Sequence, residues 1–402
     1  MADPAPRLRR TLFLAESFPP SPGGASRSLG ALVARFPAGA GVVSTPHRAG
    51  CGRVDRTMSV PVRRARTFVG PSGIGLRLWR TQVEWLVRRD SPRTLVICGS
   101  GADGRLGLEL HESHDLPFLV MADAPEIAAL RAGAEAGAQP ARDLVDRASA
   151  MVVPTRTAWL EAYKLHTRPH DLELIPAAVD LQSFRPGTAD AGLRKKLQAG
   201  RGPVVLTVND GDPAFDAETV LQAFAALRGS LRRAVLVAVG LREPRHRSLA
   251  KKLKVDRGVR FLDAPPSELP DLYRAADLFL TAHLGGRDAP IQGAGHVLAE
   301  ALASGLPVLG TRTPATSDVV DEDECGLLVE PGAHAKLGKV AADLLRDDEK
   351  RGAMGAAARE AAEEHHDAAR CAERLHTLLE VLLIRRLRRE PAGPTGAHLP
   401  AA

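Results

Sequence analysis

Residues 269–345 have the sequence LPDLYRAADLFLTAHLGGRDAPIQGAGHVLAEALASGLPVLGTRTPATSDVVDEDECGLLVEPGAHAKLGKVAADLL. Three apolar runs in it, 277–282, 307–311 and 326–330, have the length of buried strands. After the last run, Leu337, Ala341 and Leu344 recur at helical spacing. Short apolar strands that alternate with helices are typical of a parallel sheet covered by helices, so this stretch predicts α/β structure.

The same alternation extends over the rest of the chain. Helical spacing recurs at 217–228, and further apolar runs lie at 11–15, 41–45, 94–99, 117–123, 150–155, 172–177, 204–210, 234–240 and 259–263. The twelve runs are more than one doubly wound sheet usually holds, and the segment between Asp180 and Pro203 is rich in Gly, Pro and charge. We therefore predict an amino-terminal Rossmann-like domain (1–185), a linker (186–203), a carboxyl-terminal Rossmann-like domain (204–366), a terminal helix that packs back on the amino domain (367–390) and a disordered tail (391–402).

The composition favours a globular protein. Of 402 residues, 44% are hydrophobic and 25% charged, and only 4% are aromatic, which argues against a surface for stacking nucleic-acid bases. No apolar run approaches the roughly 18 residues of a membrane span. The apolar segment 11–15 is too short for a signal peptide, so we expect a cytoplasmic protein, with peripheral contact at the inner membrane face left open.

Cysteine and histidine spacing gives no sign of a metal site. The four cysteines are far apart and are expected to be packing residues, and the run HESH (111–114) lacks the spacing of a helical zinc motif. His365 and His366 are expected to face solvent. We therefore expect neither a bound metal nor a cofactor.

Positive charge is concentrated in the first quarter of the chain. Residues 1–100 contain 16 Arg and 5 acidic residues, a net charge of 16 − 5 = +11. Such a surface is either a solvated arginine-rich face or a region that attracts an anionic or lipid-linked partner. The terminal helix, expected at 372–386, has a leucine face and a basic end, so it is a second candidate for contact with an anionic membrane.

The run QGAGHVLAEALASG (292–305) has the features of an anion-binding helix start. Gly293, Ala294 and Gly295 lack bulky side chains, so backbone N–H groups there can approach the diphosphate of a sugar nucleotide. Glu300 follows within about two helical turns, where its carboxylate can accept hydrogen bonds from a ribose diol. The alternative is a helix start made of small residues with an exposed glutamate.

A different ligand is indicated by GSGADG (99–104). This G-x-G-x-x-G run follows an apolar strand, and Asp123 comes about 20 residues later, as in a dinucleotide-binding fingerprint. An NAD(P)-binding protein is therefore kept as a less favoured alternative.

Residues 269–345 strongly resemble the nucleotide-sugar-binding domain of the family 4 retaining glycosyltransferases. The segment FPPSPGGASRSL (18–29) is similar to the glycine-rich first loop of that family, and IPAAVD (175–180) to its motif before the linker. The resemblance implies a GT-B fold, in which two Rossmann-like domains face each other across a cleft. It implies transfer of a sugar, with retention, from a nucleotide diphosphate donor to a hydroxyl of an acceptor held by the amino domain.

The resemblance also assigns roles to individual residues. Glu300 would hold the ribose, and Gln292, which stands where the family has a first glutamate, would contact the sugar. Gly23 and Gly24 would approach the donor together with Gly293, Ala294 and Gly295. In the amino half, where many relatives have a histidine, this sequence has Asp123 and Glu126 nearby. Each either orients the acceptor hydroxyl or is a helix-capping or loop acid.

The sequence departs from the family at the donor diphosphate. Asp210 and Phe215 stand where relatives have an arginine and a lysine. Candidate replacements for the missing charges are Arg242, Arg287 and Arg312, with ordinary surface arginines as the alternative. Together with Gln292, these departures motivate an alternative function, in which a glycosyltransferase-like protein with impaired catalysis serves as a binding or accessory protein.

Overall fold

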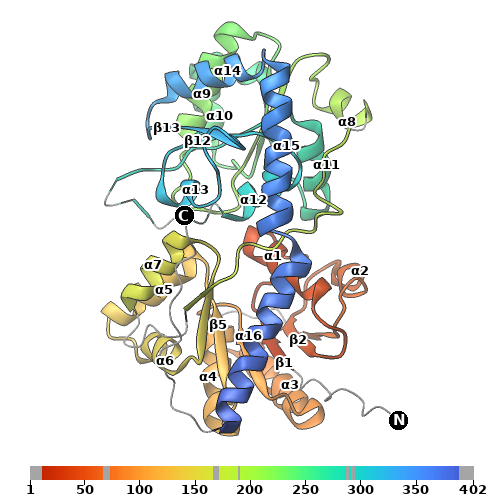
Figure 1. Ribbon diagram of the computed structural model, residues 1–402, viewed down its shortest axis with the longest axis vertical. Coiled ribbons are helices and arrows are strands. Elements are labelled where there is room, and N and C mark those ends of the chain that lie inside the picture. Colours follow the sequence, from red (N-terminus) through yellow and green to blue (C-terminus); the bar gives the residue numbers. More distant parts are fainter. Residues whose placement is uncertain are drawn as a thin grey trace. The chain divides into compact units, whose positions relative to one another are not determined.

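The computed structural model describes residues 11–66, 73–165, 172–188, 191–286, 289–290, 293 and 295–388 (Figure 1). Internal contacts divide the chain into two units, one formed by residues up to Ser21, Ala25–Pro176 and the residues from Ala368 on, the other by Pro22–Gly24 and Ala177–Asp367. Each unit has a parallel sheet with helices, so the predicted fold class is confirmed. The functional division into an acceptor domain, 1–185, and a donor domain, 204–366, stays a prediction.

The sheet of the first unit has the strand order β3-β2-β1-β4-β5-β6-β7. Its strands are β1 (Thr11–Leu14), β2 (Gly41–Pro46), β3 (Val62–Ala65), β4 (Thr94–Ile97), β5 (Phe118–Met121), β6 (Ala150–Val153) and β7 (Leu172–Leu174). All neighbouring strands are parallel, and β1 and β4 are buried along their whole length. Because the strand order reverses between β1 and β4, ligands are expected at the carboxyl ends of these two strands.

Strand β3 was not predicted from the sequence. Its residues, VRRA, lie at the sheet edge, and only Ala65 is fully buried. An edge strand with two arginines has no apolar run, so hydrophobic patterning gives no signal for it.

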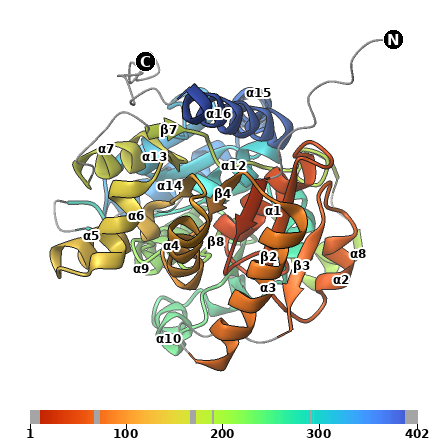
Figure 2. The same ribbon diagram turned by 90° about the horizontal axis from the view of Figure 1, so that it is seen from below.

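Helices of the first unit lie on both faces of its sheet (Figure 2). They are α1 (Gly24–Arg35), α2 (Cys51–Asp55), α3 (Ile74–Asp90), α4 (Ala102–His114), α5 (Ala124–Glu135), α6 (Gln139–Arg147), α7 (Arg156–Leu165) and α16 (Ala368–Arg388). The terminal helix α16 buries Leu375, Leu379 and Leu382, and its His376 ring packs edge-on against Phe36 at 5.5 Å. Among the described residues, no helix is both long and apolar enough to cross a bilayer.

The sheet of the second unit has the strand order β10-β9-β8-β11-β12-β13, again with all neighbours parallel. Its strands are β8 (Val204–Val208), β9 (Val235–Val239), β10 (Val259–Leu262), β11 (Leu278–Leu280), β12 (Val308–Thr311) and β13 (Gly326–Val329). The strand order reverses between β8 and β11, which places the expected ligand position of this unit at the loops that follow them.

Eight α-helices are described in the second unit: α8 (Ala191–Lys196), α9 (Ala217–Ser230), α10 (Pro244–Lys252), α11 (Leu269–Ala275), α12 (Gly295–Ala303), α13 (Pro314–Ser317), α14 (His334–Leu344) and α15 (Asp348–His365). The helices predicted at 217–228 and after 337 are confirmed as α9 and α14. These two pack closely, because Gly338 lets the backbone of α14 approach that of α9: a Cβ at Gly338 would lie 2.3 Å from the carbonyl oxygen of Ala223.

The expectation that His366 faces solvent was wrong. His366 is the C-terminal cap of α15 and is 6% exposed, and its Nδ1 lies 2.9 Å from the carbonyl oxygen of Ala177. Burial lowers the pKa of His366 to about 4, so the ring is neutral at neutral pH. The helical pattern of the sequence around His366 does not reveal this burial.

Candidate functional site

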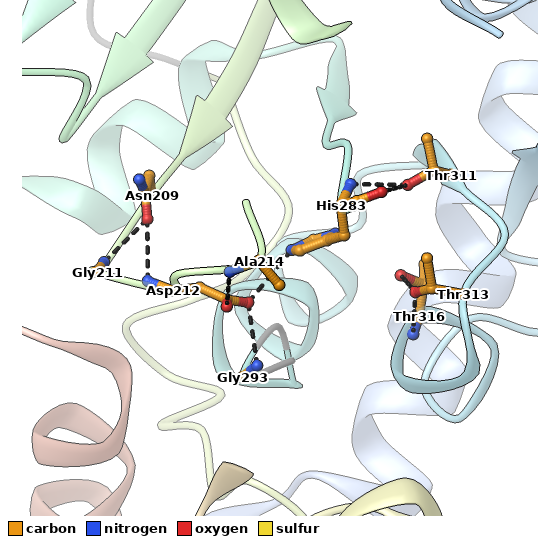
Figure 3. A network of polar contacts seen from close by, with 9 residues as sticks. All are labelled: Asn209, Gly211, Asp212, Ala214, His283, Gly293, Thr311, Thr313 and Thr316. Carbon is orange, nitrogen blue, oxygen red and sulfur yellow. Dashed lines mark hydrogen bonds and ion pairs between the residues drawn. The ribbon is translucent and has the colours of Figure 1, made fainter. Parts of the chain in front are cut away.

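The loop after β8 forms a compact turn at the switch point of the second unit (Figure 3). The Asn209 side chain accepts hydrogen bonds from the N–H groups of Gly211, at 2.9 Å, and Asp212, at 3.1 Å. The Asp212 carboxylate in turn accepts from the N–H of Ala214 at 2.8 Å. These bonds fix the direction of the Asp212 side chain.

Asp212 links this turn to the glycine loop before α12. Its Oδ2 accepts a hydrogen bond from the N–H of Gly293 at 3.0 Å and lies 3.5 Å from Nε2 of His283, which follows β11. The residue is only 8% exposed, and burial, with a smaller contribution from the charge of Asp210, raises the pKa of its carboxyl. One carboxylate thus joins the loops after β8 and β11 to the start of the predicted diphosphate-binding segment.

His283 is held from several sides. The backbone N–H of His283 donates a hydrogen bond to Oγ1 of Thr311 at 2.7 Å. The Thr311 hydroxyl donates to the backbone carbonyl of His283 at 3.1 Å. The Phe215 ring packs edge-on against the imidazole at 5.9 Å. Burial lowers the pKa of His283 to about 4, so a neutral ring faces Asp212. Phe215, which stands at the family's lysine position, therefore contacts this histidine.

Glu300 lies on α12 and is 3% exposed. The Tyr273 hydroxyl, from α11, is 3.1 Å from Glu300 Oε2 and 3.1 Å from the Val297 carbonyl, and it can donate its one proton to either oxygen. The Tyr273 ring stacks on Phe279 of β11, with ring centroids 5.7 Å apart. A buried carboxylate oriented by a tyrosine hydroxyl differs from the exposed glutamate of the alternative interpretation.

The other predicted donor residues fall in different places. By their contacts, Gly23 and Gly24 group with the second unit, where the N–H of Gly24 donates to Asp210 Oδ2 at 2.8 Å. Arg242 pairs with Asp263 and is 68% exposed. Gly295 is the first residue of α12. Arg287, Gln292 and Ala294 lie outside the described residues.

A second group of carboxylates lies at the switch point of the first unit. Glu16 follows β1, and its Oε2 accepts from the N–H of Ala102, the first residue of α4, at 2.9 Å. The N–H of Glu16 donates to Oδ2 of Asp103 at 3.1 Å. Asp103 is 2% exposed, and burial is the main cause that raises the pKa of its carboxyl to about 7.

These carboxylates lie against two of the three glycines in the run 99–104. A Cβ at Gly99 would lie 2.8 Å from Asp103 Oδ2, and one at Gly101 would lie 2.6 Å from Glu16 Oε2. A dinucleotide-binding protein uses such glycines to admit a pyrophosphate to the start of the helix. Here a side-chain carboxylate of the protein itself takes the first N–H of α4.

Asp123 and Glu126 both lie near the start of α5 and have different roles. Asp123 is the N-terminal cap of the helix and accepts from the N–H of Glu126 at 3.2 Å. Oε2 of Glu126 accepts from the N–H of Ser100 at 2.8 Å and from its hydroxyl at 2.5 Å. Glu126 therefore joins the loops after β4 and β5, and Asp123 stabilises the start of the helix.

Comparisons with known proteins relate this chain to glycosyltransferases. Residues 191–361 match the model of the family described as glycosyl transferases group 1. Solved structures agree on the fold: Anabaena HepE in complex with UDP and glucose is 18% identical with a TM-score of 0.75, the match covering 93% of this chain and 100% of that one. WaaG, a glycosyltransferase involved in lipopolysaccharide biosynthesis, is 18% identical with a TM-score of 0.65, over 92% and 99% of the two chains. The chain has the GT-B fold.

Two curated relatives are similar over part of their length. The GDP-mannose-dependent α-(1-6)-phosphatidylinositol monomannoside mannosyltransferase of Mycobacterium tuberculosis is 32% identical over 47% of this chain and 50% of that protein. The D-inositol 3-phosphate glycosyltransferase of Corynebacterium glutamicum is 31% identical over 53% of each. The chain thus spans about half the length of the curated relatives that it matches.

Sequence reasoning missed Asp212, His283 and Tyr273 as parts of the site. Asp212 and His283 are brought together by the order of the strands, and Tyr273 reaches Glu300 from a helix 27 residues earlier. The one signal in the sequence was positional, because Asp212 and His283 each follow an apolar run and strand ends at a switch point carry ligand-binding residues.

Proposed function

We propose that the protein is a retaining glycosyltransferase that moves a sugar from a nucleotide diphosphate donor to an acceptor hydroxyl. The observation that carries this proposal is the buried carboxylate of Glu300, which lies beside the Tyr273 hydroxyl. Glu300 is on α12, in a segment that matches a glycosyltransferase family model. Sugar nucleotides are the donor substrates, and no cofactor or metal is part of the proposal.

In the proposed donor complex, Glu300 accepts hydrogen bonds from the ribose diol and Tyr273 keeps Oε2 in place. The segment 293–295 approaches the diphosphate through its backbone, and Gln292 contacts the sugar. Asp212 holds Gly293, so the N–H of Gly293 serves to position the loop, and the remaining N–H groups at the start of α12 face the anion. In the reaction, the bond from the anomeric carbon to the diphosphate oxygen breaks and a bond to the acceptor oxygen forms on the same face of the sugar.

The acceptor is proposed to be anionic or lipid-linked. The names of the relatives refer to phosphatidylinositol mannosides and to inositol 3-phosphate, and the first 100 residues carry a net charge of +11 by the count above. Glu126 is the carboxylate proposed to orient the acceptor hydroxyl. Ser100 donates both of its hydrogen bonds to Oε2 of Glu126, and Oε1 is the oxygen proposed to accept a hydrogen bond from the acceptor hydroxyl. Asp123 caps the same helix and accepts a hydrogen bond from the backbone N–H of Glu126, so it fixes the start of the helix that carries Glu126.

Loss of catalysis is the second candidate, and Asp210 and Phe215 are the observations behind it. Asp210 is anionic and Phe215 is uncharged, so neither side chain can neutralise a diphosphate. In the structure Asp210 accepts a hydrogen bond from Gly24, and Phe215 packs against His283. The two curated relatives are named as transferases, which favours an active enzyme.

The acceptor class is tested by incubating the protein and each sugar nucleotide with inositol phosphate, phosphatidylinositol or a neutral glycoside, and by following release of the nucleoside diphosphate. Transfer to an inositol-containing phosphate, with the anomeric configuration of the donor kept in the NMR spectrum of the product, is expected. An inverted product would contradict retention. Transfer to the neutral glycoside alone would contradict the anionic acceptor. The variant Gln292→Glu restores the carboxylate of the family and should raise the rate if transfer occurs.

A further inference from the structure

Helix α3 has apolar side chains on two opposite faces. One face packs on the first sheet, where Trp79 and Val83 are fully buried. On the other face Ile74, Leu78 and Trp85 are 75%, 48% and 50% exposed. At 100° per residue these three side chains lie within about 40° of one another, so they form one stripe along the helix. We call it the α3 stripe.

Arginines flank the α3 stripe on both sides. Arg77 and Arg88 lie along one edge, and Arg89 lies along the other with its guanidinium 4.7 Å from the centre of the Trp85 ring. Arg89, Asp90 and Arg63 of β3 line the same surface hollow, and Asp90 lies 3.9 Å from Arg89. The two arginines carry positive charge from the helix to the neighbouring strand. Figure 2 shows α3 on the outside of the first unit, next to that sheet edge.

We propose that the α3 stripe docks the protein on an anionic membrane surface. An apolar centre with a tryptophan, bordered by arginines, matches a bilayer interface: the apolar side chains enter the acyl boundary while the guanidinium groups reach the lipid phosphates. This proposal goes beyond the reaction, because it concerns binding to a surface and needs no turnover.

The charges argue against a second copy of the chain as the occupant. Two copies that bury this stripe against each other would bring the arginines at its edges together, and like charges in a protein interface oppose association. Glu84 balances part of this charge through Arg80 and Arg88, both at 3.6 Å, yet α3 still has four arginines against Glu84 and Asp90. An anionic lipid surface neutralises the excess directly.

The test is flotation of the full chain with phosphatidylcholine vesicles and with vesicles that also contain phosphatidylglycerol. Binding is expected only with phosphatidylglycerol. The double variant Leu78→Gln/Trp85→Gln should weaken binding by about tenfold or more, because each removes a large apolar side chain from the interface. Leu160→Gln on α7 is the matched control, since Leu160 is also 50% exposed, and it should bind as the unsubstituted chain does.

The role of the arginines and the insertion of Trp85 into the bilayer are tested separately. Arg77→Gln/Arg88→Gln should weaken binding to anionic vesicles and reduce its salt dependence, whereas Arg156→Gln on α7 should not. Lipids with brominated acyl chains should quench Trp85, and the quenching should disappear in Trp85→Phe, because the other two tryptophans, the fully buried Trp79 and Trp159 of α7, do not belong to the α3 stripe.

Three results would overturn the proposal. The first is no binding to either kind of vesicle. The second is a loss of vesicle binding in Leu160→Gln as large as the loss in the α3 variants. The third is a dimer of the unsubstituted chain in solution that the α3 variants dissociate, which would make a second copy the occupant. Turnover with a water-soluble acceptor should be unchanged in the α3 variants, so failure of membrane binding and failure of the proposed reaction are separate outcomes.

Discussion

The backbone N–H of Gly293 donates a hydrogen bond to the Asp212 carboxylate at 3.0 Å, and this bond joins the loop after β8 to the loop before α12. Asp212 is buried and fixed by Ala214, so it determines where the glycine loop begins. Its effect on catalysis would come through Gly293, which makes Asp212 a positioning residue.

Replacing Asp212 tests this role. Asp212→Ala should weaken donor binding by about tenfold, the effect of losing one hydrogen bond to a charged group. Asp212→Asn keeps a side-chain oxygen that can accept from Gly293 and should recover most of the affinity. Calorimetric titration with the donor gives both values. Equal affinity of the alanine variant and the unsubstituted chain would show that the loop is held by other contacts.

Glu300 should contribute more to donor binding than its partner Tyr273. Glu300→Ala removes the carboxylate that is proposed to bind the ribose diol and should weaken donor binding by roughly a hundredfold. Tyr273→Phe leaves the carboxylate in place and should cost about three- to tenfold. Glu360→Ala, at an exposed position on α15, is the control. A tyrosine variant as damaged as the glutamate variant would mean that the hydroxyl does more than orient Oε2.

The contact between α9 and α14 predicts opposite effects of two similar substitutions. Gly338→Ala should destabilise the protein by about 1–3 kcal/mol, because the added methyl group meets the backbone of Ala223. Gly352→Ala on α15 has open space around it and should stabilise by about 0.5–1 kcal/mol, through lower entropy of the unfolded chain. Urea unfolding measures both free energies. Similar values for the two variants would contradict the close packing of the helices.

Asp103 should make stability depend on pH. Its carboxyl has a pKa of about 7 when folded, against 3.8 in the unfolded chain, so between these values the folded protein holds a proton that the unfolded chain releases. The free energy of unfolding should therefore fall as pH rises from about 4 to about 7, by on the order of 4 kcal/mol for a shift of about three pKa units.

The variant Asp103→Asn is neutral at every pH and should remove this slope from urea unfolding measured at several pH values. Asp115→Asn is the control, because Asp115 is an exposed carboxylate of the same unit whose side chain is 88% exposed. If the slope persisted in Asp103→Asn and disappeared in Asp115→Asn, the proton would not be bound by Asp103, and the prediction would be wrong.

The fold was predictable to the extent that strands are buried. The twelve apolar runs all appear as strands, because a parallel sheet covered on both faces requires apolar side chains along each strand. Strand β3 escaped notice because an edge strand can carry arginines. The burial of His366 was not predicted because it depends on a tertiary contact with Ala177, which lies far away in the sequence.

The candidate site was predictable only in part. The glycine segment and Glu300 follow one another in sequence, so their spacing indicates a helix start with a carboxylate two turns later. Asp212, His283 and Tyr273 come from three separate segments, and their distances depend on the strand order and on side-chain packing. The glycines at 99 and 101 show the reverse case, where a short pattern typical of dinucleotide binding serves to accommodate the protein's own carboxylates.

The most direct test of the central claim is to titrate UDP-, GDP- and ADP-sugars into the purified protein by calorimetry, in parallel with the Glu300→Ala variant, while following release of the nucleoside diphosphate in the presence of acceptor. We predict that one sugar nucleotide binds and is turned over by the unsubstituted chain, and that Glu300→Ala binds it roughly a hundredfold more weakly. Binding of a donor with the same affinity in the Glu300→Ala variant, or binding of none of the sugar nucleotides, would contradict the donor site assigned to α12.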